Sequence, residues 1–240
     1  MEDYTPKEEV KYTFRQRLEN FWYHYKWHSI VSLFLIIAIT VCTLQMCSKS
    51  EYDAYIMYAG PYPATQSEVR DIQTSLGSVC DDYNDDGESL VSISNLFMMT
   101  KEQIDERNAK DDGYEVNEKL ISDNTNIFNQ QIQIGEYAIL LLDPAWVEFL
   151  YSVNEADNIL MRVEEFLPEG KELSLYGEYG VYLSSTGLYT LPGLCNLPDN
   201  TVLCMRKNGS LGSIFRKNST AENHENHKDL FKKLLAYTPS

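Results

Sequence analysis

Basic residues are scarce in this sequence, which has 20 Lys and Arg against 36 Asp and Glu in 240 residues. Proteins that bind the phosphate backbone of nucleic acids need clustered basic side chains. The shortage therefore argues against a nucleic-acid partner. Acids and bases balance in residues 1–48, so the whole formal net charge of −16 belongs to residues 49–240.

Motifs of familiar enzymes are absent as well. The chain has no Gly-x-Ser-x-Gly turn, no phosphate-binding loop and no dinucleotide fingerprint. It has no internal repeat or low-complexity tract, and no pair of carboxylates stands out for acid–base work. We therefore predict a protein that is not an enzyme and has no resident cofactor, and we keep an ectoenzyme of unnamed chemistry as an alternative.

Charge of either sign is missing from residues 29–48, which are mostly Ile, Leu, Val, Phe and Ala. A helix of ~20 residues spans ~30 Å, which is the thickness of the hydrocarbon core of a bilayer. Residues 21–28 before this run are aromatic with one base, as in an interfacial belt. The pattern predicts a transmembrane helix over 29–48, with a buried core helix as the alternative.

The bases near this run set its expected orientation. Arg15, Arg17 and Lys26 precede it, whereas Lys49 stands alone on the other side until Arg70. The positive-inside rule then predicts a cytoplasmic segment over 1–28, amphipathic and next to the membrane, and an extracytoplasmic domain over 49–240. A cleaved signal peptide or a lipidated form is the alternative, although the run is long and starts late for either.

Strand-like and helix-like segments alternate after the apolar run. Three segments resemble strands, namely 52–59, 90–96 and 137–142. We expect a helix between each strand and the next segment of the chain. Within the stretch after 90–96, residues 101–123 are predicted as loop or weak helix. This order predicts an α/β fold with one mainly parallel sheet and helices on its faces. Tyr- and Gly-rich β segments follow beyond residue 160, and a helix over 222–237 ends the pattern.

A ligand site is expected where the parallel strands end, because open α/β sheets bind ligands at that edge. The residues predicted there are Tyr58, Gly60, Asn95 and Asp143. Tyr176, Tyr179 and Tyr182 from the later region could add to them. Each also has an ordinary structural explanation, and Asp143 in particular suits the N-cap of a helix that begins with Pro144.

An acidic segment resembles the first half of a calcium-binding loop. Asp82, Asn84 and Asp86 supply oxygen at positions one, three and five, Gly87 would make the turn, and Glu88 would contribute its backbone carbonyl. Position nine is Leu90, and position twelve is Ile93 where a carboxylate is needed. A Ca²⁺ site, with Asp81 or Asp85 helping, is therefore weighed against an acidic turn between a helix and a strand.

Cysteine and histidine give weaker signals. Cys195 and Cys204 flank a short segment and could form a disulfide across a hairpin, or they could be two small buried side chains. His224 and His227 are spaced by three residues rather than the four of a zincin helix, so they indicate metal binding only loosely.

Four stretches together carry a family resemblance, namely ENFWYHYKWH, YDAYIMYAGPY, DDYNDDGE and YAILLLDPAWVEFL. With the single apolar run, the chain resembles uncharacterised single-pass membrane proteins of low-GC Gram-positive, Clostridia-type bacteria. Residues 137–184 also resemble one lobe of extracellular solute-binding proteins. The first resemblance implies a membrane location and no known activity, and the second implies capture of a small ligand.

These observations favour a membrane-anchored extracytoplasmic module that binds without catalysis. We expect it to contact the lipid bilayer and a membrane protein partner. A reduced solute-binding-like domain that captures a small molecule is the alternative.

Overall fold

The computed structural model describes residues 13–47, 52–110, 115–152, 159–208 and 221–239. The chain forms two compact units, residues 1–50 and 51–240, which we treat separately. Residues 1–12 of the segment predicted to be cytoplasmic lie outside the described residues.

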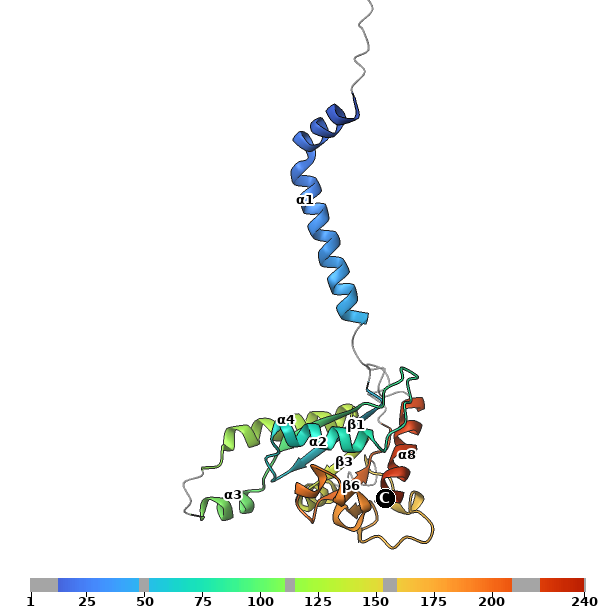
Figure 1. Ribbon diagram of the computed structural model, residues 1–240. Helices are drawn as coiled ribbons and strands as arrows, with labels where there is room; N and C mark the ends of the chain where they lie inside the picture. The colour runs from blue at the N-terminus through green and yellow to red at the C-terminus, as the bar shows by residue number, and fades with distance from the viewer. Residues whose placement is uncertain (1–12, 48–51, 111–114, 153–158, 209–220, 240) are drawn as a thin grey trace, which may run out of the picture. The chain divides into compact units, whose positions relative to one another are not determined.

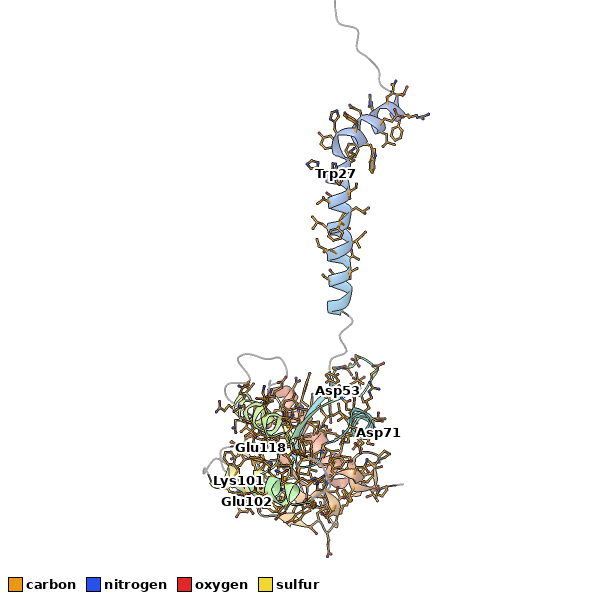
Figure 2. The ribbon with its side chains drawn as sticks, turned by 90° about the vertical axis from the view of Figure 1, so that its left-hand side faces the viewer. Trp27, Asp53, Asp71, Lys101, Glu102 and Glu118 are labelled. Carbon is orange, nitrogen blue, oxygen red and sulfur yellow. The ribbon has the colours of Figure 1, made fainter. Side chains whose placement is uncertain are left out.

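The first unit contains one long helix, α1 (Phe14–Cys47). Its segment Phe14–Thr43 is long and apolar enough to cross a membrane. The helix bends near Trp27, and its side chains project on all sides (Figures 1 and 2). Large apolar side chains along it are exposed, and Phe34 and Ile39 are 68% and 64% exposed. Aromatic interface residues and the apolar run thus belong to a single continuous helix.

The second unit is built on a six-stranded sheet with the order β2-β1-β3-β6-β5-β4. The strands are β1 (Ala54–Gly60), β2 (Val91–Phe97), β3 (Ile139–Leu142), β4 (Leu175–Tyr176), β5 (Gly180–Tyr182) and β6 (Val202–Met205). The α-helices of this unit are α2 (Gln66–Gly77), α3 (Lys101–Asn108), α4 (Glu118–Ile134), α5 (Pro144–Ser152) and α8 (Ala221–Ala236). Short 3-10 helices are η1 (Val163–Glu165), η2 (Leu183–Ser185), η3 (Gly187–Thr190) and η4 (Leu194–Asn196).

The α/β class is as predicted, but the expectation of a mainly parallel sheet is wrong. β1 pairs in parallel with β2 and with β3, whereas β3–β6, β6–β5 and β5–β4 are antiparallel. Parallel neighbours need a long crossover, which α2 and then α3 and α4 provide. Beyond β3, a turn of three residues, Gly177–Tyr179, joins β4 to β5. A turn of that length cannot make the crossover that a parallel pair requires, so β4 and β5 must be antiparallel.

Two layers of apolar side chains cover the two faces of the sheet. On one face Ile56 and Leu141 pack with Ile72 of α2 and Phe231 of α8. On the other face Met57, Leu140 and Leu142 pack with Phe128 of α4 and Val147 of α5. The strands β1 and β3 are therefore buried on both sides, which fits their nearly continuous apolar sequences.

Capping residues explain where the helices begin. The sequence Thr65-Gln66-Ser67-Glu68 has the pattern of a capping box, and that box is present at the start of α2. A second box, Thr100 with Gln103, starts α3, and Asn117 caps α4. The segment 101–123, predicted as loop or weak helix, is helical at both of its ends. Because this segment is polar throughout, its capping residues do not stand out in the sequence. They accept hydrogen bonds from backbone N–H groups that an exposed helix would otherwise leave unpaired.

Candidate functional site

The residues expected at the strand ends do meet. Tyr58 and Asn95 are register partners on β1 and β2. The backbone N–H of Asp143 donates to the carbonyl of Ala59 at 2.9 Å, which places Asp143 just past the end of β3. Burial, and secondarily the Asp143 charge, raise the pKa of Tyr58 well above its usual range. Tyr58, Asn95 and Asp143 thus form one cluster, which we call the strand-end cluster.

Internal hydrogen bonds occupy this cluster. One Asp143 carboxylate oxygen accepts from the N–H of Ala145 at 2.9 Å, and the other accepts from Nε2 of Gln103 at 3.3 Å. The Asp143 side chain thus caps α5 and holds the first turn of α3, and the residue is only 4% exposed. The Asp143 carboxylate is therefore occupied by the helices that follow β2 and β3.

Gly60 lies next to the cluster, at a position where the Tyr58 side chain requires a residue without a Cβ atom. A Cβ atom on Gly60 would lie 2.7 Å from the Tyr58 hydroxyl oxygen, inside any normal contact distance. The same hydroxyl accepts a hydrogen bond from the N–H of Tyr62 at 3.1 Å. Gly60 therefore lets the Tyr58 ring fold over the end of its own strand, and its role is structural.

A neighbouring network was not predicted. The Tyr62 hydroxyl donates to Glu68, and Nδ2 of Asn196 donates to the same carboxylate oxygen at 3.0 Å. Hydrogen bonds from Tyr62 and Thr65 lower the pKa of Glu68 to about 2, and the bond to Glu68 raises the pKa of Tyr62 to about 12. The network ties the start of α2 to η4. The capping box was the only sequence signal for it, since Asn196 is distant in the chain.

The later tyrosines lie on the other face of the sheet. Tyr176 and Tyr182 are in edge-to-face contact at 5.5 Å, within the layer that contains α5. The Tyr176 hydroxyl donates to Glu148 of α5 at 3.0 Å. Tyr179 is also buried in that layer. These tyrosines therefore do not join the layer that contains Tyr58.

The acidic segment forms a turn whose oxygens face its own backbone. The Asp82 carboxylate accepts from the N–H groups of Asp86 and Gly87 at 3.2 and 2.7 Å. Asn84 accepts from Asp86 at 2.9 Å, and Asp86 accepts from Glu88 at 3.0 Å. These bonds fold the turn without a ligand, and the Ca²⁺ site remains a prediction.

Asp53 anchors this turn from outside it. One of its carboxylate oxygens accepts from the N–H groups of Tyr83 and Asn84 at 2.8 and 3.2 Å, and the other accepts from Leu90 at 2.8 Å. The residue is 7% exposed and immediately precedes β1. A single buried carboxylate therefore fixes both ends of the acidic segment against the sheet.

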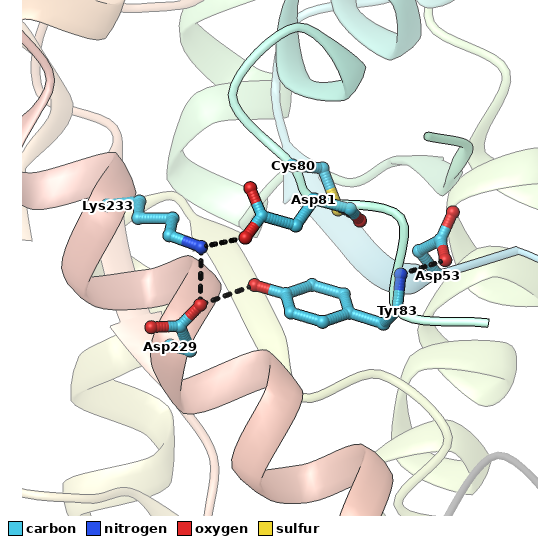
Figure 3. A network of polar contacts seen from close by, with 6 residues as sticks. All are labelled: Asp53, Cys80, Asp81, Tyr83, Asp229 and Lys233. Atoms are coloured by element: carbon cyan, nitrogen blue, oxygen red, sulfur yellow. Dashed lines mark hydrogen bonds and ion pairs between the residues drawn. The ribbon is translucent and has the colours of Figure 1, made fainter. Parts of the chain in front are cut away.

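The same segment is tied to the last helix, as Figure 3 shows. The Tyr83 hydroxyl donates to Asp229 at 2.8 Å, and Nζ of Lys233 lies 2.5 Å from both Asp229 and Asp81. The bond from Lys233 lowers the pKa of Asp229 despite some burial. Burial raises the pKa of the nearby Cys80 thiol to about 12, so this cysteine stays protonated. The arrangement is a structural clamp between the acidic segment and α8.

His227 of α8 has a structural role. Nε2 of the buried His227 accepts from the N–H of Tyr55 at 3.1 Å, and Nδ1 contacts the carbonyl of Asn223. Within the described ranges no group of three or more His, Cys, Asp or Glu side chains is placed to hold a metal ion. His227 thus links α8 to β1.

The cysteine pair is not bonded in the structure. Cys195 and Cys204 are both free thiols, the first exposed in η4 and the second buried on β6. The segment between them runs from a 3-10 helix into β6 rather than around a hairpin, which explains why the two sulfurs do not face each other. Only Cys204 fits the alternative of a small buried side chain.

The fold and this geometry define a mixed α/β domain that follows a helix able to span a membrane. No protein-family model, no curated protein and no solved structure matches the chain. Any function must therefore be argued from the contacts described above.

Proposed function

We propose that the protein is a single-pass membrane protein whose domain, residues 51–240, lies outside the cytoplasm and binds a membrane protein partner without catalysis. The observation that carries the proposal is α1, whose large apolar side chains are uncovered along the whole span. Uncovered apolar surface on this scale is expected only against lipid or another protein. An α-helix also satisfies its own backbone groups in lipid.

The orientation rests on the charges next to the span. Arg15 and Arg17 lie in the first turns of α1, and Lys26 lies near the bend. Such bases favour the cytoplasmic side. The excess of acidic residues in the second unit is compatible with its transfer across the membrane, because Asp and Glu contribute little to the orientation of a span.

Binding without catalysis is supported by the state of the carboxyl groups. Those with a perturbed pKa among the described residues are shifted downward by hydrogen bonds or by neighbouring bases, and they are Glu68, Glu102, Glu225 and Asp229. A general acid near neutral pH would need a raised pKa. These four carboxyl groups therefore supply no candidate general acid for the ectoenzyme alternative.

A small-ligand function is the second candidate. It is favoured by Asn95, whose Nδ2 donates to Ala64 at 3.1 Å while its buried Oδ1 has no hydrogen-bond partner. Against it stands the Asp143 carboxylate, which α3 and α5 already occupy. A partner that binds the outer surface leaves these hydrogen bonds intact, so we rank it first.

Fractionation and protease access test the proposal on the full chain. We expect the protein in the membrane fraction and its carboxyl-terminal domain degraded when protease is added to intact cells. The matched variant carries Ile36→Lys and Ile37→Lys, because each charge at the centre of a span costs about 3 kcal/mol. This variant should leave the membrane fraction. A wild-type protein found free in the cytosol, or a domain spared by external protease, would overturn the proposal.

Co-purification in mild detergent tests the partner. A membrane protein recovered with the wild type and lost with the double lysine variant supports the accessory role. A thermal-shift screen of the full chain with amino acids and sugars tests the second candidate, because a bound ligand raises Tm by mass action. Shifts with such compounds and no recovered partner would favour the small-ligand function.

A further inference from the structure

The first part of α1, residues 14–27, carries an apolar stripe before the uncharged run begins, and we call this part the juxtamembrane segment. The stripe consists of side chains that recur at helical spacing and are each more than half exposed, namely Phe14, Leu18, Phe21, Trp22 and Tyr25. At ~100° per residue, these side chains together cover ~100° of the helix surface. The juxtamembrane segment is therefore an amphipathic helix whose apolar face is exposed.

Basic side chains flank the stripe on both sides. The opposite face of the segment is polar, with Gln16, Asn20 and Tyr23 at its centre. Between the two faces, Arg17 lies ~80° to one side of the middle of the stripe and Lys26 lies ~100° to the other. A helix that lies in the surface of a membrane has this pattern, because the stems of Arg and Lys follow the apolar surface while their charged ends reach the polar layer.

A groove runs along one edge of the stripe. It has a volume of about 530 Å³ and is lined by Leu18, Glu19, Phe21, Trp22, Tyr23 and Lys26. Glu19, the acid of this groove, pairs with Arg15 at 3.2 Å, whereas Lys26 has no ion-pair partner among the described residues. An apolar groove beside an ammonium group matches a phospholipid, in which the phosphate adjoins the glycerol and the acyl chains.

The length of α1 decides how this segment meets the bilayer. If the helix ran straight along the membrane normal, Leu18 would stand ~16 Å and Phe14 ~22 Å beyond the hydrocarbon core that begins at Ser29. The headgroup layer on each side is only ~5–8 Å thick, so a straight helix would hold most of its stripe in water. The bend near Trp27 instead turns the juxtamembrane segment away from the axis of the apolar run (Figure 2).

We propose that the juxtamembrane segment lies flat in the cytoplasmic headgroup layer, with its stripe against acyl chains and with Arg17 and Lys26 on phospholipid phosphates. The inference rests on the proposed membrane span and its orientation. Lipid covers the stripe, because the stripe continues directly into the span and because a base stands on each side of it at the height of the phosphates. The segment thereby fixes the depth of the span in the bilayer.

Quenching of tryptophan fluorescence tests the position of the segment in the full chain. The three native tryptophans are replaced by Phe, namely Trp22, Trp27 and Trp146, and one tryptophan is then introduced at a chosen position. Leu18→Trp reports on the stripe, and Asn20→Trp is the matched control because it lies on the opposite face of the same segment. Ile36→Trp reports on the span. Each variant is reconstituted in vesicles of phosphatidylcholine and phosphatidylglycerol in equal parts, with bromine on the acyl chains or with iodide in the water on both sides.

We expect bromine to quench Leu18→Trp several-fold more strongly than Asn20→Trp, and iodide to show the reverse order. Adding Arg17→Gln and Lys26→Gln should weaken the bromine quenching of Leu18→Trp, and unchanged quenching would overturn the role given to the bases. Equal iodide quenching of Leu18→Trp and Asn20→Trp would overturn the flat position, as for a straight helix or for a stripe that only a protein partner covers. If bromine fails to quench Ile36→Trp, the span is wrong and the proposed function falls with this inference. If bromine quenches Ile36→Trp while iodide reaches Leu18→Trp, this inference alone is wrong.

Discussion

Asp53 makes the strongest prediction about stability. Its carboxylate accepts three backbone hydrogen bonds, from Tyr83, Asn84 and Leu90, at a site that is 7% exposed. Replacing it by Ala leaves three donors without their acceptor, and each unpaired buried donor costs about 1–3 kcal/mol. Because the acidic segment borders solvent, we take the lower figure and expect a loss of about 3 kcal/mol. For a domain of this size, Tm should fall by about 6–12 °C.

The variant Asp53→Asn refines the test. Its amide oxygen can still accept from Tyr83 and Asn84, but its NH₂ group faces the N–H of Leu90 and the charge is lost. We therefore expect about half the effect of the Ala variant. The assay is thermal unfolding of the full chain in detergent, monitored through the near-UV circular dichroism of the tyrosines.

Asp71→Ala is the matched control, because Asp71 is an exposed carboxylate on α2 (Figure 2). It should change Tm by less than about 1 °C, as expected for an exposed substitution. Equal Tm values for Asp53→Ala and Asp71→Ala would refute the anchoring role of Asp53. Equal losses for Asp53→Ala and Asp53→Asn would refute the account in terms of counted hydrogen bonds.

Three further predictions follow from the contacts. Burial lowers the pKa of His227 below its usual 6.5 and that of His224 to about 4. The unfolded chain then binds the protons first, so their contribution to stability is complete above pH ~6.5 and falls by up to about 1.4 kcal/mol per pH unit and per histidine below it. Unfolding measured from pH 8 to 5 should show this loss, and His227→Gln should have a flatter profile; a profile unchanged by that variant would contradict the assignment. Gly60→Ala should cost about 1–3 kcal/mol, because its Cβ would meet the Tyr58 hydroxyl at 2.7 Å. Adding Tyr58→Phe removes that oxygen and should recover part of the loss, whereas simple additivity in denaturant unfolding would count against the clash. Calorimetric titration with Ca²⁺ should give heat with the wild type and none with Asp82→Ala if the acidic segment binds the ion, and absence of heat at millimolar ion would end that hypothesis.

Local patterns accounted for much of the second unit. Strand-like segments that alternate with helix-like segments in the sequence correspond to β1, β2 and β3. The order of these elements predicted an α/β fold with Tyr58, Asn95 and Asp143 at one edge of the sheet. This worked because parallel strands with helical crossovers bring their carboxyl ends together. The N-cap explanation for Asp143 was also available from the following proline and is present as a bond to Ala145.

Contacts between distant residues could not be derived in the same way. Nothing in the sequence pairs Glu68 with Asn196, His227 with Tyr55, or Asp53 with Leu90. The antiparallel half of the sheet was missed because short strands of two to four residues, β4, β5 and β6, carry too little periodicity to reveal their direction.

The sequence by itself determined that one helix can span a membrane and that an acidic α/β domain follows it, since hydropathy and periodicity are local properties of the chain. Only the tertiary structure decided that α3 and α5 occupy the Asp143 carboxylate and that β2 is an outer strand of the sheet. Both are set by packing between segments far apart in the sequence.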